Sequence, residues 1–273
     1  MRGLVRPSSD ASGVESVGAE VVRGTLGEPE SLAAACDGVG TVVCTATAIA
    51  RELAGTGGGG IDEVDRTGVG NLIQAAERAG VERFVYVSYA GVEAGLGFPL
   101  ERAKLANEQR LESAGMRRVV VRPDAFQELH LGATAQFDIA GGKVGVLGRG
   151  DTRRRFVATD DIATLLGELA LEAEPPELIE VGGPEALSKN DAIEFVEQTG
   201  GLKLKRQRLP RPLVRLGMHL LSRPRPALAA VFGLGLLMDL HEGTATDAPL
   251  RERGIEPRSA SEWLRRQLEP DFA

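Results

Sequence analysis

Short runs of β-branched and apolar residues alternate with longer helical patterns over the first two thirds of the chain. The strand-like runs lie at residues 4–5, 19–24, 41–46, 83–88 and 118–123, and helical patterns begin at Glu28, span 61–78 and span roughly 99–113. Strands that alternate with crossover helices are typical of a parallel sheet with helices on both faces. The sequence therefore predicts an α/β protein with a doubly wound parallel sheet.

The pattern changes after about residue 135. A glycine-bounded short strand is expected at 141–148 and a helix at 162–172, and the run Ser188-Lys189-Asn190-Asp191 has the form of a capping box at the start of a further helix. We therefore expect two parts. Residues 1–135 form the core, and residues 136–273 form a small C-terminal substrate lobe interleaved with late strands of that core.

The segment 211–238 admits two interpretations. Its apolar stretch, 227–238, is too short to span a membrane, and it follows the basic residues Arg211, Arg215, Arg223 and Arg225. A helix of the core or of an interface explains this pattern. Basic residues beside an apolar helix also favour contact with a protein partner or peripheral contact with a membrane surface.

Charge and cysteine content narrow the class of protein. A net charge of −7 and a pI near 5.2 argue against nucleic-acid binding, which needs clustered cations. The dense basic runs at 153–155 and 203–208 are expected at solvated strand ends, or in contact with an anionic substrate. Cys36 and Cys44 do not have the spacing of a metal-binding or redox motif, and the three histidines are scattered along the chain, so we expect no metal site. The low cysteine content also favours a reducing, cytoplasmic location.

Five segments together resemble a known family; they lie at 3–7, 18–26, 75–88, 121–123 and 182–185. In this order and spacing they resemble the NmrA-like, NAD(P)-binding branch of the atypical short-chain dehydrogenases/reductases. The resemblance implies a Rossmann-like fold and an oxidoreductase that binds NADP or NAD and acts on a small molecule. It also implies an alternative: a regulatory or assembly protein that senses NAD(P)H without turnover, such as one associated with a respiratory or quinone complex.

The resemblance places a cofactor at the carboxyl ends of the strands. Arg6 would favour the extra phosphate of NADP over NAD, although a solvated arginine at a strand end is the simpler interpretation. Thr25, followed by Leu26, stands where the family usually carries an aspartate that faces the adenine. Further cofactor contacts are implied at Thr45, Ala46, Thr47, Ser88, Pro123 and Phe126.

The catalytic pair of the family is altered in this chain. Typical members carry Tyr-x-x-x-Lys, whereas here Leu100 stands in the tyrosine position and Lys104 remains. The resemblance implies that Lys104 binds the nicotinamide ribose and serves as the acid/base; alternatively, it is a solvent lysine paired with Glu101 or Glu108. Tyr89 is a second candidate for a catalytic phenol, and packing is its alternative role.

No strand followed by a glycine-rich turn precedes residue 4, although such a turn brings a pyrophosphate to a helix N-terminus in this fold. We therefore expect an upstream extension in the natural protein. We also expect two unpaired strand edges inside the sheet and poor dinucleotide binding by the chain as it stands.

Overall fold

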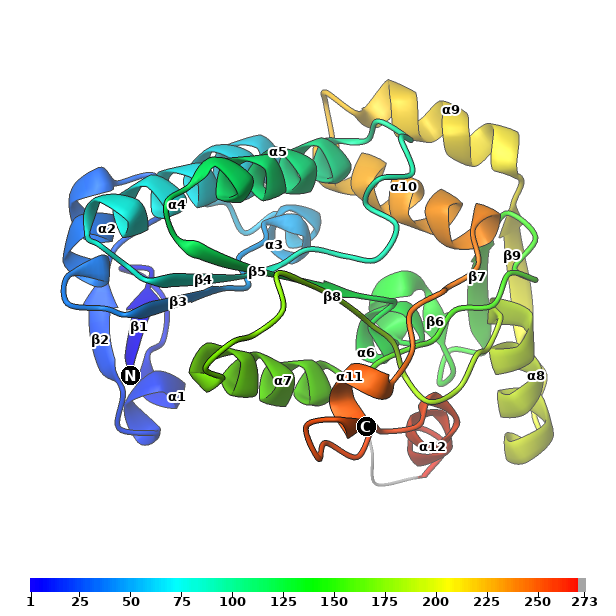
Figure 1. The fold of residues 1–273 in the computed structure, drawn as a ribbon. Helices are drawn as coiled ribbons and strands as arrows, with labels where there is room; N and C mark the ends of the chain where they lie inside the picture. The colour runs from blue at the N-terminus through cyan, green and yellow to red at the C-terminus, as the bar shows by residue number, and fades with distance from the viewer. Residues whose placement is uncertain (270–273) are drawn as a thin grey trace.

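A computed structural model describes residues 1–269, and its main sheet is parallel, as the sequence predicts (Figure 1). All five strands expected in the core form, each within about two residues of its predicted bounds. The strands are β1 (Arg2–Val5), β2 (Glu20–Arg23), β3 (Thr41–Cys44), β4 (Arg83–Val87), β5 (Arg117–Pro123), β6 (Phe137–Asp138), β7 (Lys143–Leu147), β8 (Leu178–Val181) and β9 (Lys205–Leu209). β8 joins β5 in parallel, so a late strand completes the main sheet in the order β3-β4-β5-β8.

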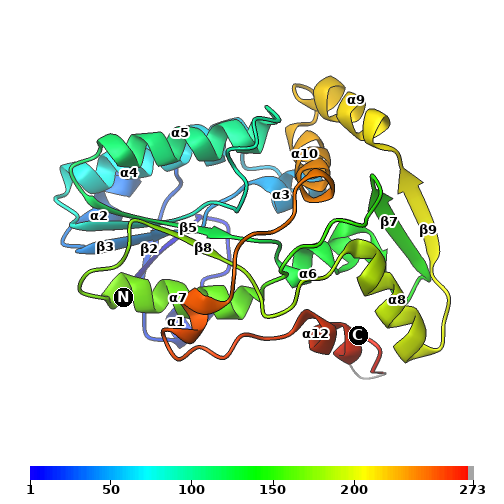
Figure 2. The same ribbon diagram turned by 45° about the vertical axis from the view of Figure 1, so that its right-hand side comes forward.

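Helices cover both faces of this sheet, with α2, α4 and α5 on one side and α7 on the other (Figures 1 and 2). The helices are α1 (Ser12–Ser16), α2 (Pro29–Cys36), α3 (Ile49–Ala54), α4 (Val69–Arg78), α5 (Pro99–Ser113), α6 (Gln127–His130), α7 (Thr159–Leu171), α8 (Lys189–Gly200), α9 (Arg211–Leu221), α10 (Pro226–Leu240), α11 (Ala248–Arg251) and α12 (Ala260–Arg266). The predicted helix over 61–78 is present, but its first part, Asp62–Gly68, is a π-helix.

The sheet is interrupted between β1 and β3. β1 pairs with β2 alone and β3 with β4 alone among residues 1–269, although Leu4 of β1 and Val42 of β3 pack against the same hydrophobic core. Val43 of β3 is 43% exposed, which is unusual for a strand inside a sheet covered by helices. The expectation of two unpaired internal edges is confirmed.

A second, three-stranded sheet with the order β6-β7-β9 packs with α8 and α12 and has its own hydrophobic core. α8 begins as predicted: the Ser188 hydroxyl accepts from the Asp191 amide, and the Asp191 carboxylate accepts from the Ser188 amide. The carboxyl ends of β5 and β8 point toward this lobe and toward α10 (Figure 1). Any ligand at the strand ends therefore lies between the sheet and the lobe.

The expectation that residues 153–155 are solvated is wrong for Arg154. Only 5% of its side chain is exposed, and its guanidinium binds the fully buried carboxylate of Asp124, with Nε 2.7 Å from Oδ1. Arg155 donates to the carbonyl oxygens of Gly183 and Pro184. Of the three arginines, only Arg153 has an exposed side chain, because Arg154 and Arg155 bind partners from distant parts of the chain. The second basic run, in contrast, forms the exposed edge strand β9.

Candidate functional site

The strand ends of β4 and β5 are held in register beyond the last residues of the strands. The Ser88 amide donates to the Val121 carbonyl, and the Ala90 amide donates to the Pro123 carbonyl, both at 2.8 Å. Ser88, Tyr89 and Pro123 therefore lie together at the carboxyl edge of the sheet, where ligands bind in folds of this type. Phe126 follows in a bridge to Val157, so it borders the same edge.

Lys104 reaches this edge from α5. Its side chain is buried, its ammonium donates to the Val87 carbonyl at 2.8 Å, and Nζ lies 4.8 Å from the centroid of the Tyr86 ring. Lys104 is thus neither solvated nor ion-paired with Glu101 or Glu108, so the alternative interpretation of Lys104 as a solvent lysine is wrong. Burial lowers the pKa of its ammonium, and the nearby charge of Asp65 partly opposes that change.

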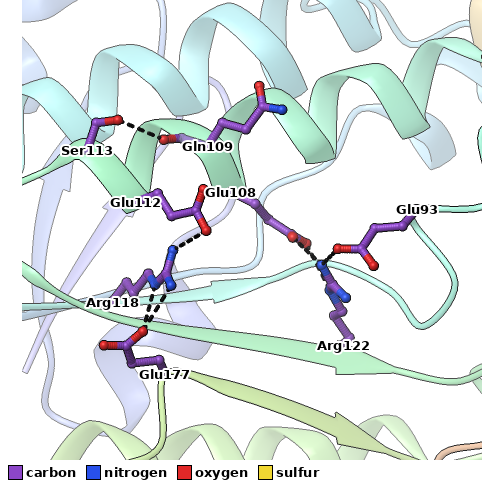
Figure 3. A network of polar contacts seen from close by, with 8 residues as sticks. All are labelled: Glu93, Glu108, Gln109, Glu112, Ser113, Arg118, Arg122 and Glu177. Atoms are coloured by element: carbon purple, nitrogen blue, oxygen red, sulfur yellow. Dashed lines mark hydrogen bonds and ion pairs between the residues drawn. The ribbon is translucent and has the colours of Figure 1, made fainter.

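Arg122 fixes the position of α5 relative to the sheet. Figure 3 shows its guanidinium at the end of β5, between Glu108 of α5 and Glu93 of the loop after β4. The Nη2 atom lies 2.6 Å from the Glu108 carboxylate and 2.9 Å from that of Glu93. Because Glu108 is one helical turn from Lys104, this clamp holds the ammonium at the strand ends.

Asp65 is the buried carboxylate that the sequence analysis missed. It lies in the π-helical segment and is fully buried; Oδ2 accepts from the Ala48 amide at 2.9 Å, and Oδ1 has no partner among residues 1–269. Burial raises the pKa of Asp65, whereas Lys104 opposes the rise. The sequence did indicate that Asp65 is buried, because it falls on the apolar face of the helical pattern, four residues before Val69 and eight before Ile73.

Asn107 links this carboxylate segment to the strand. Its side-chain amide donates to the Asp65 carbonyl at 2.5 Å and to the Tyr86 hydroxyl at 3.1 Å. Tyr86 is fully buried and is therefore a packing residue that carries one satisfied hydroxyl. The sequence analysis did not single out Asn107, because its partners lie 21 and 42 residues away.

Tyr89 carries an unpartnered phenol. Its ring stacks on Phe98 with centroids 6.3 Å apart, and its hydroxyl is buried without a hydrogen-bond partner among the described residues. Burial raises the pKa of Tyr89, and the carboxylates of Glu101 and Glu108 raise it further. The phenol therefore stays protonated near neutral pH and can donate a hydrogen bond to a ligand.

Unpartnered buried polar atoms concentrate at this edge. Of the five such side-chain atoms among residues 1–269, four lie here: Asp65 Oδ1, Ser88 Oγ, Tyr89 OH and Gln127 Oε1. Native proteins rarely leave buried polar groups unsatisfied, so a cluster of them is a place where a polar ligand or ordered water can supply the missing partners. The donors and acceptors present fit the hydroxyl and amide groups of a dinucleotide.

Basic side chains gather beyond β1. A Cβ on Gly58 would stand 3.4 Å from Arg6 Nη1 and would clash with Arg51 Nη1, so both guanidiniums lie against this glycine. Arg23 donates to the carbonyl oxygens of Arg6 and Ser9, which fixes the loop after β1. Among residues 1–269, none of these three arginines forms an ion pair with a carboxylate, which leaves positive charge for an anion.

The remaining predicted cofactor residues lie near the carboxyl ends of β2 and β3. The Thr25 backbone is held by the Ser31 hydroxyl, and Leu26 packs against the first core while its carbonyl accepts from Asn71. Thr45 and Thr47 are exposed, and Ala46, half-buried, packs against the same core. The structure therefore leaves these residues accessible to a ligand, but their contacts with a cofactor stay predictions.

Comparison with known proteins gives one family match. The model of a family described as NAD(P)H-binding matches residues 1–172. The "Photosystem II assembly factor Ycf39" of Trieres chinensis is 28% identical over 219 residues, which are 79% of this chain and 66% of that protein. This chain thus spans about two thirds of that relative's length. The "Uncharacterized sugar epimerase YhfK" of Bacillus subtilis is 30% identical over 173 residues, 60% of this chain and 72% of that protein.

Solved structures share the fold at low sequence identity. The NADPH-dependent quinone oxidoreductase QOR2 of Escherichia coli, solved with NADPH, has a TM-score of 0.73 and 18% identity; the match covers 97% of this chain and 89% of that one. The triphenylmethane reductase of Citrobacter sp., solved with NADP(H), has a TM-score of 0.74 and 17% identity over the same shares of the two chains. These likenesses show that the chain has a Rossmann-like fold.

Proposed function

Because this chain belongs to the NAD(P)H-binding family, we propose that it is an NADP(H)-dependent oxidoreductase that acts on a small organic molecule at the carboxyl edge of its main sheet. One observation carries the proposal. Four unpartnered buried polar atoms lie at this edge, where the buried ammonium of Lys104 is also held. A site of this kind binds a polar ligand and holds a group that exchanges protons.

Arg6 and Arg51 support NADP over NAD. Both lie against Gly58 at the carboxyl edge, and neither is neutralised by a carboxylate among residues 1–269. A guanidinium in this place suits the phosphate on the adenosine ribose, which NAD lacks. The solved relatives QOR2 and triphenylmethane reductase contain NADPH or NADP(H), which agrees with this choice.

Lys104 is the better proton donor of the two candidates. When bound, the reduced nicotinamide would supply a hydride, and the acceptor would then need a proton. Burial raises the pKa of Tyr89 and lowers that of Lys104, so the ammonium releases a proton more readily than the phenol does. Lys104 therefore moves the proton, while the Tyr89 hydroxyl orients the substrate by a hydrogen bond.

The test is NADPH oxidation measured by absorbance with a panel of carbonyl, enone and quinone compounds. Lys104→Met should lower kcat by about 100-fold or more, since a positioned general acid typically contributes that much. The matched control is Lys143→Met, which removes an exposed lysine of β7 and should leave kcat unchanged. Wild-type turnover by Lys104→Met would contradict the proposed role, and failure of the wild type to oxidise NADPH with any compound would contradict the oxidoreductase proposal.

A second function is favoured by the altered pair of residues. Leu100 stands in the tyrosine position of the family, and Lys104 donates to the Val87 carbonyl, as in a structural role. The Ycf39 relatives are assembly factors, which suits a protein that binds NADP(H) and reports on it to a protein partner without turnover. NADPH binding without oxidation across the whole panel would select this second function.

A further inference from the structure

Helix α9 presents a stripe of leucines to solvent. Leu213, Leu216 and Leu220 are 52%, 52% and 66% exposed, and their spacing places them within about 60° of one another around the helix axis. Val214 and Met218 are buried on the side that packs on α10. Both ribbon views place α9 on the outside of the molecule, beyond α10 (Figures 1 and 2). The stripe is therefore an apolar face without an internal partner.

The packing on α10 prevents the helix from turning the leucines inward. A Cβ on Gly217 would lie 2.6 Å from Cε2 of Phe232, so the two helices approach as closely as a glycine allows. Met218 belongs to the hydrophobic core that also contains Ala227 and Ala230 of α10. Rotation of α9 would remove Val214 and Met218 from this contact, so the exposed face is fixed.

The surroundings of the stripe are positively charged in an acidic protein. No Asp or Glu occurs between Glu197 and Asp239, whereas eight cations do, in a chain of net charge −7. The cations are Lys203, Lys205, Arg206, Arg208, Arg211, Arg215, Arg223 and Arg225. Arg206 and Arg211 pair with the flanking carboxylates, but Arg215, Arg223 and Arg225 pair with no carboxylate among residues 1–269. Apolar side chains and unpaired cations thus occur together on α9 and in the turn that follows it.

We propose that α9 docks this protein on the surface of an anionic lipid bilayer. Leu213, Leu216 and Leu220 enter the boundary of headgroups and acyl chains, and Arg215 and the arginines after α9 bind lipid phosphates. A second copy of the chain fits less well, because it would bring two segments of like positive charge together, whereas lipid phosphates supply the anions that Arg215, Arg223 and Arg225 lack. None of the helices among residues 1–269 is long and apolar enough to cross a bilayer, so the contact is peripheral.

The docking face and the candidate site share α10. A Cβ on Gly233 of this helix would clash with Phe98, the ring that stacks on Tyr89. Docking through α9 therefore brings the substrate side of the site close to the lipid surface. The proposal does not depend on cofactor binding, so failure of the proposed enzyme activity leaves it intact.

The experiment is flotation of the full chain with vesicles of phosphatidylglycerol and phosphatidylcholine, compared with vesicles of phosphatidylcholine alone. We expect the chain to float with the anionic vesicles, to stay behind with the neutral ones, and to be released in 1 M salt, where charges are screened beyond about 3 Å. Leu216→Asp combined with Leu220→Asp should lower partitioning by about tenfold or more. Arg215→Glu combined with Arg223→Glu should also lower it.

The matched control is Leu171→Asp, since Leu171 of α7 is 87% exposed and lies outside the stripe. It should float as the wild type does, and far-UV circular dichroism should show that every variant is folded. Equal flotation with both kinds of vesicle, no flotation at all, or an equal loss in the Leu171 and Leu216 variants would overturn the proposal. A wild-type dimer that Leu216→Asp dissociates, without vesicle binding, would assign the face to a second copy instead.

Discussion

A conservative substitution that breaks the buried ion pair between Asp124 and Arg154 should lower the free energy of unfolding of this protein strongly. Asp124 directly follows β5, its side chain is fully buried, and it accepts from Arg154 Nε at 2.7 Å and from the Arg155 amide at 2.9 Å. Asp124→Asn keeps the size of the side chain and an acceptor for the amide. It leaves the Arg154 guanidinium, with 5% exposure, facing a neutral group.

The cost follows from this burial. Removal of one partner of a buried ion pair typically lowers the free energy of unfolding by about 3–5 kcal/mol, because the remaining charge stays desolvated. We expect about 3 kcal/mol for Asp124→Asn, a large part of the 5–15 kcal/mol that stabilises a typical domain. A second substitution, Arg154→Met, should restore roughly 1–2 kcal/mol, since the unpaired charge is then absent.

Urea unfolding followed by far-UV circular dichroism measures these changes in the free energy of unfolding. The dependence of this free energy on urea concentration should stay the same in all variants. The control is Glu177→Gln, because the Glu177 carboxylate is 71% exposed and pairs with Arg118 at the surface; its effect should stay within about 1 kcal/mol. A shift for Asp124→Asn no larger than this control, or a double variant whose loss equals the sum of the single losses, would refute the reasoning.

Two further predictions concern pH and packing. Burial lowers the pKa of His130 to about 3, so between pH 6.5 and about 3 the unfolded chain binds a proton at His130 that the native protein does not bind. The free energy of unfolding should therefore fall on acidification, by up to about 1.4 kcal/mol per pH unit. His130→Gln should flatten this slope, measured by urea titrations at several pH values. An unchanged slope would show that other groups cause it. Gly183→Ala places a Cβ against the Phe156 carbonyl, so thermal unfolding should show a loss of at least about 1 kcal/mol, whereas Gly167→Ala, whose Cβ meets nothing within 4 Å, should show none.

Local patterns predicted the elements of the main sheet well. β4 and β5 are runs of β-branched and apolar residues bounded by polar ones, and α5 begins at a proline and ends two residues before Gly115, so propensity and end signals agree. The π-helical segment Asp62–Gly68 was not predictable, since its sequence also fits an ordinary α-helix.

Contacts between distant residues limited the prediction of the site. Arg154 looked solvated because its partner, Asp124, lies 30 residues earlier, and nothing local marks the pair as buried. Lys104 was placed at the site by the family resemblance, while its burial under Tyr86 depends on how α5 packs on β4. Asp65 was missed although it lies on the apolar face of its helix, where an unpaired carboxylate is rare.

We propose that the strand ends hold an NADP(H) site in which Arg6 binds the phosphate on the adenosine ribose. The most direct test is calorimetric titration of the chain with NADPH and with NADH, repeated for Arg6→Ala. We predict that NADPH binds at least about tenfold more tightly than NADH, and that Arg6→Ala removes this preference while NADH binding is unchanged, because only the contact with the phosphate is lost. Equal affinities of the wild type for the two nucleotides, or a preference that survives in Arg6→Ala, would contradict the account.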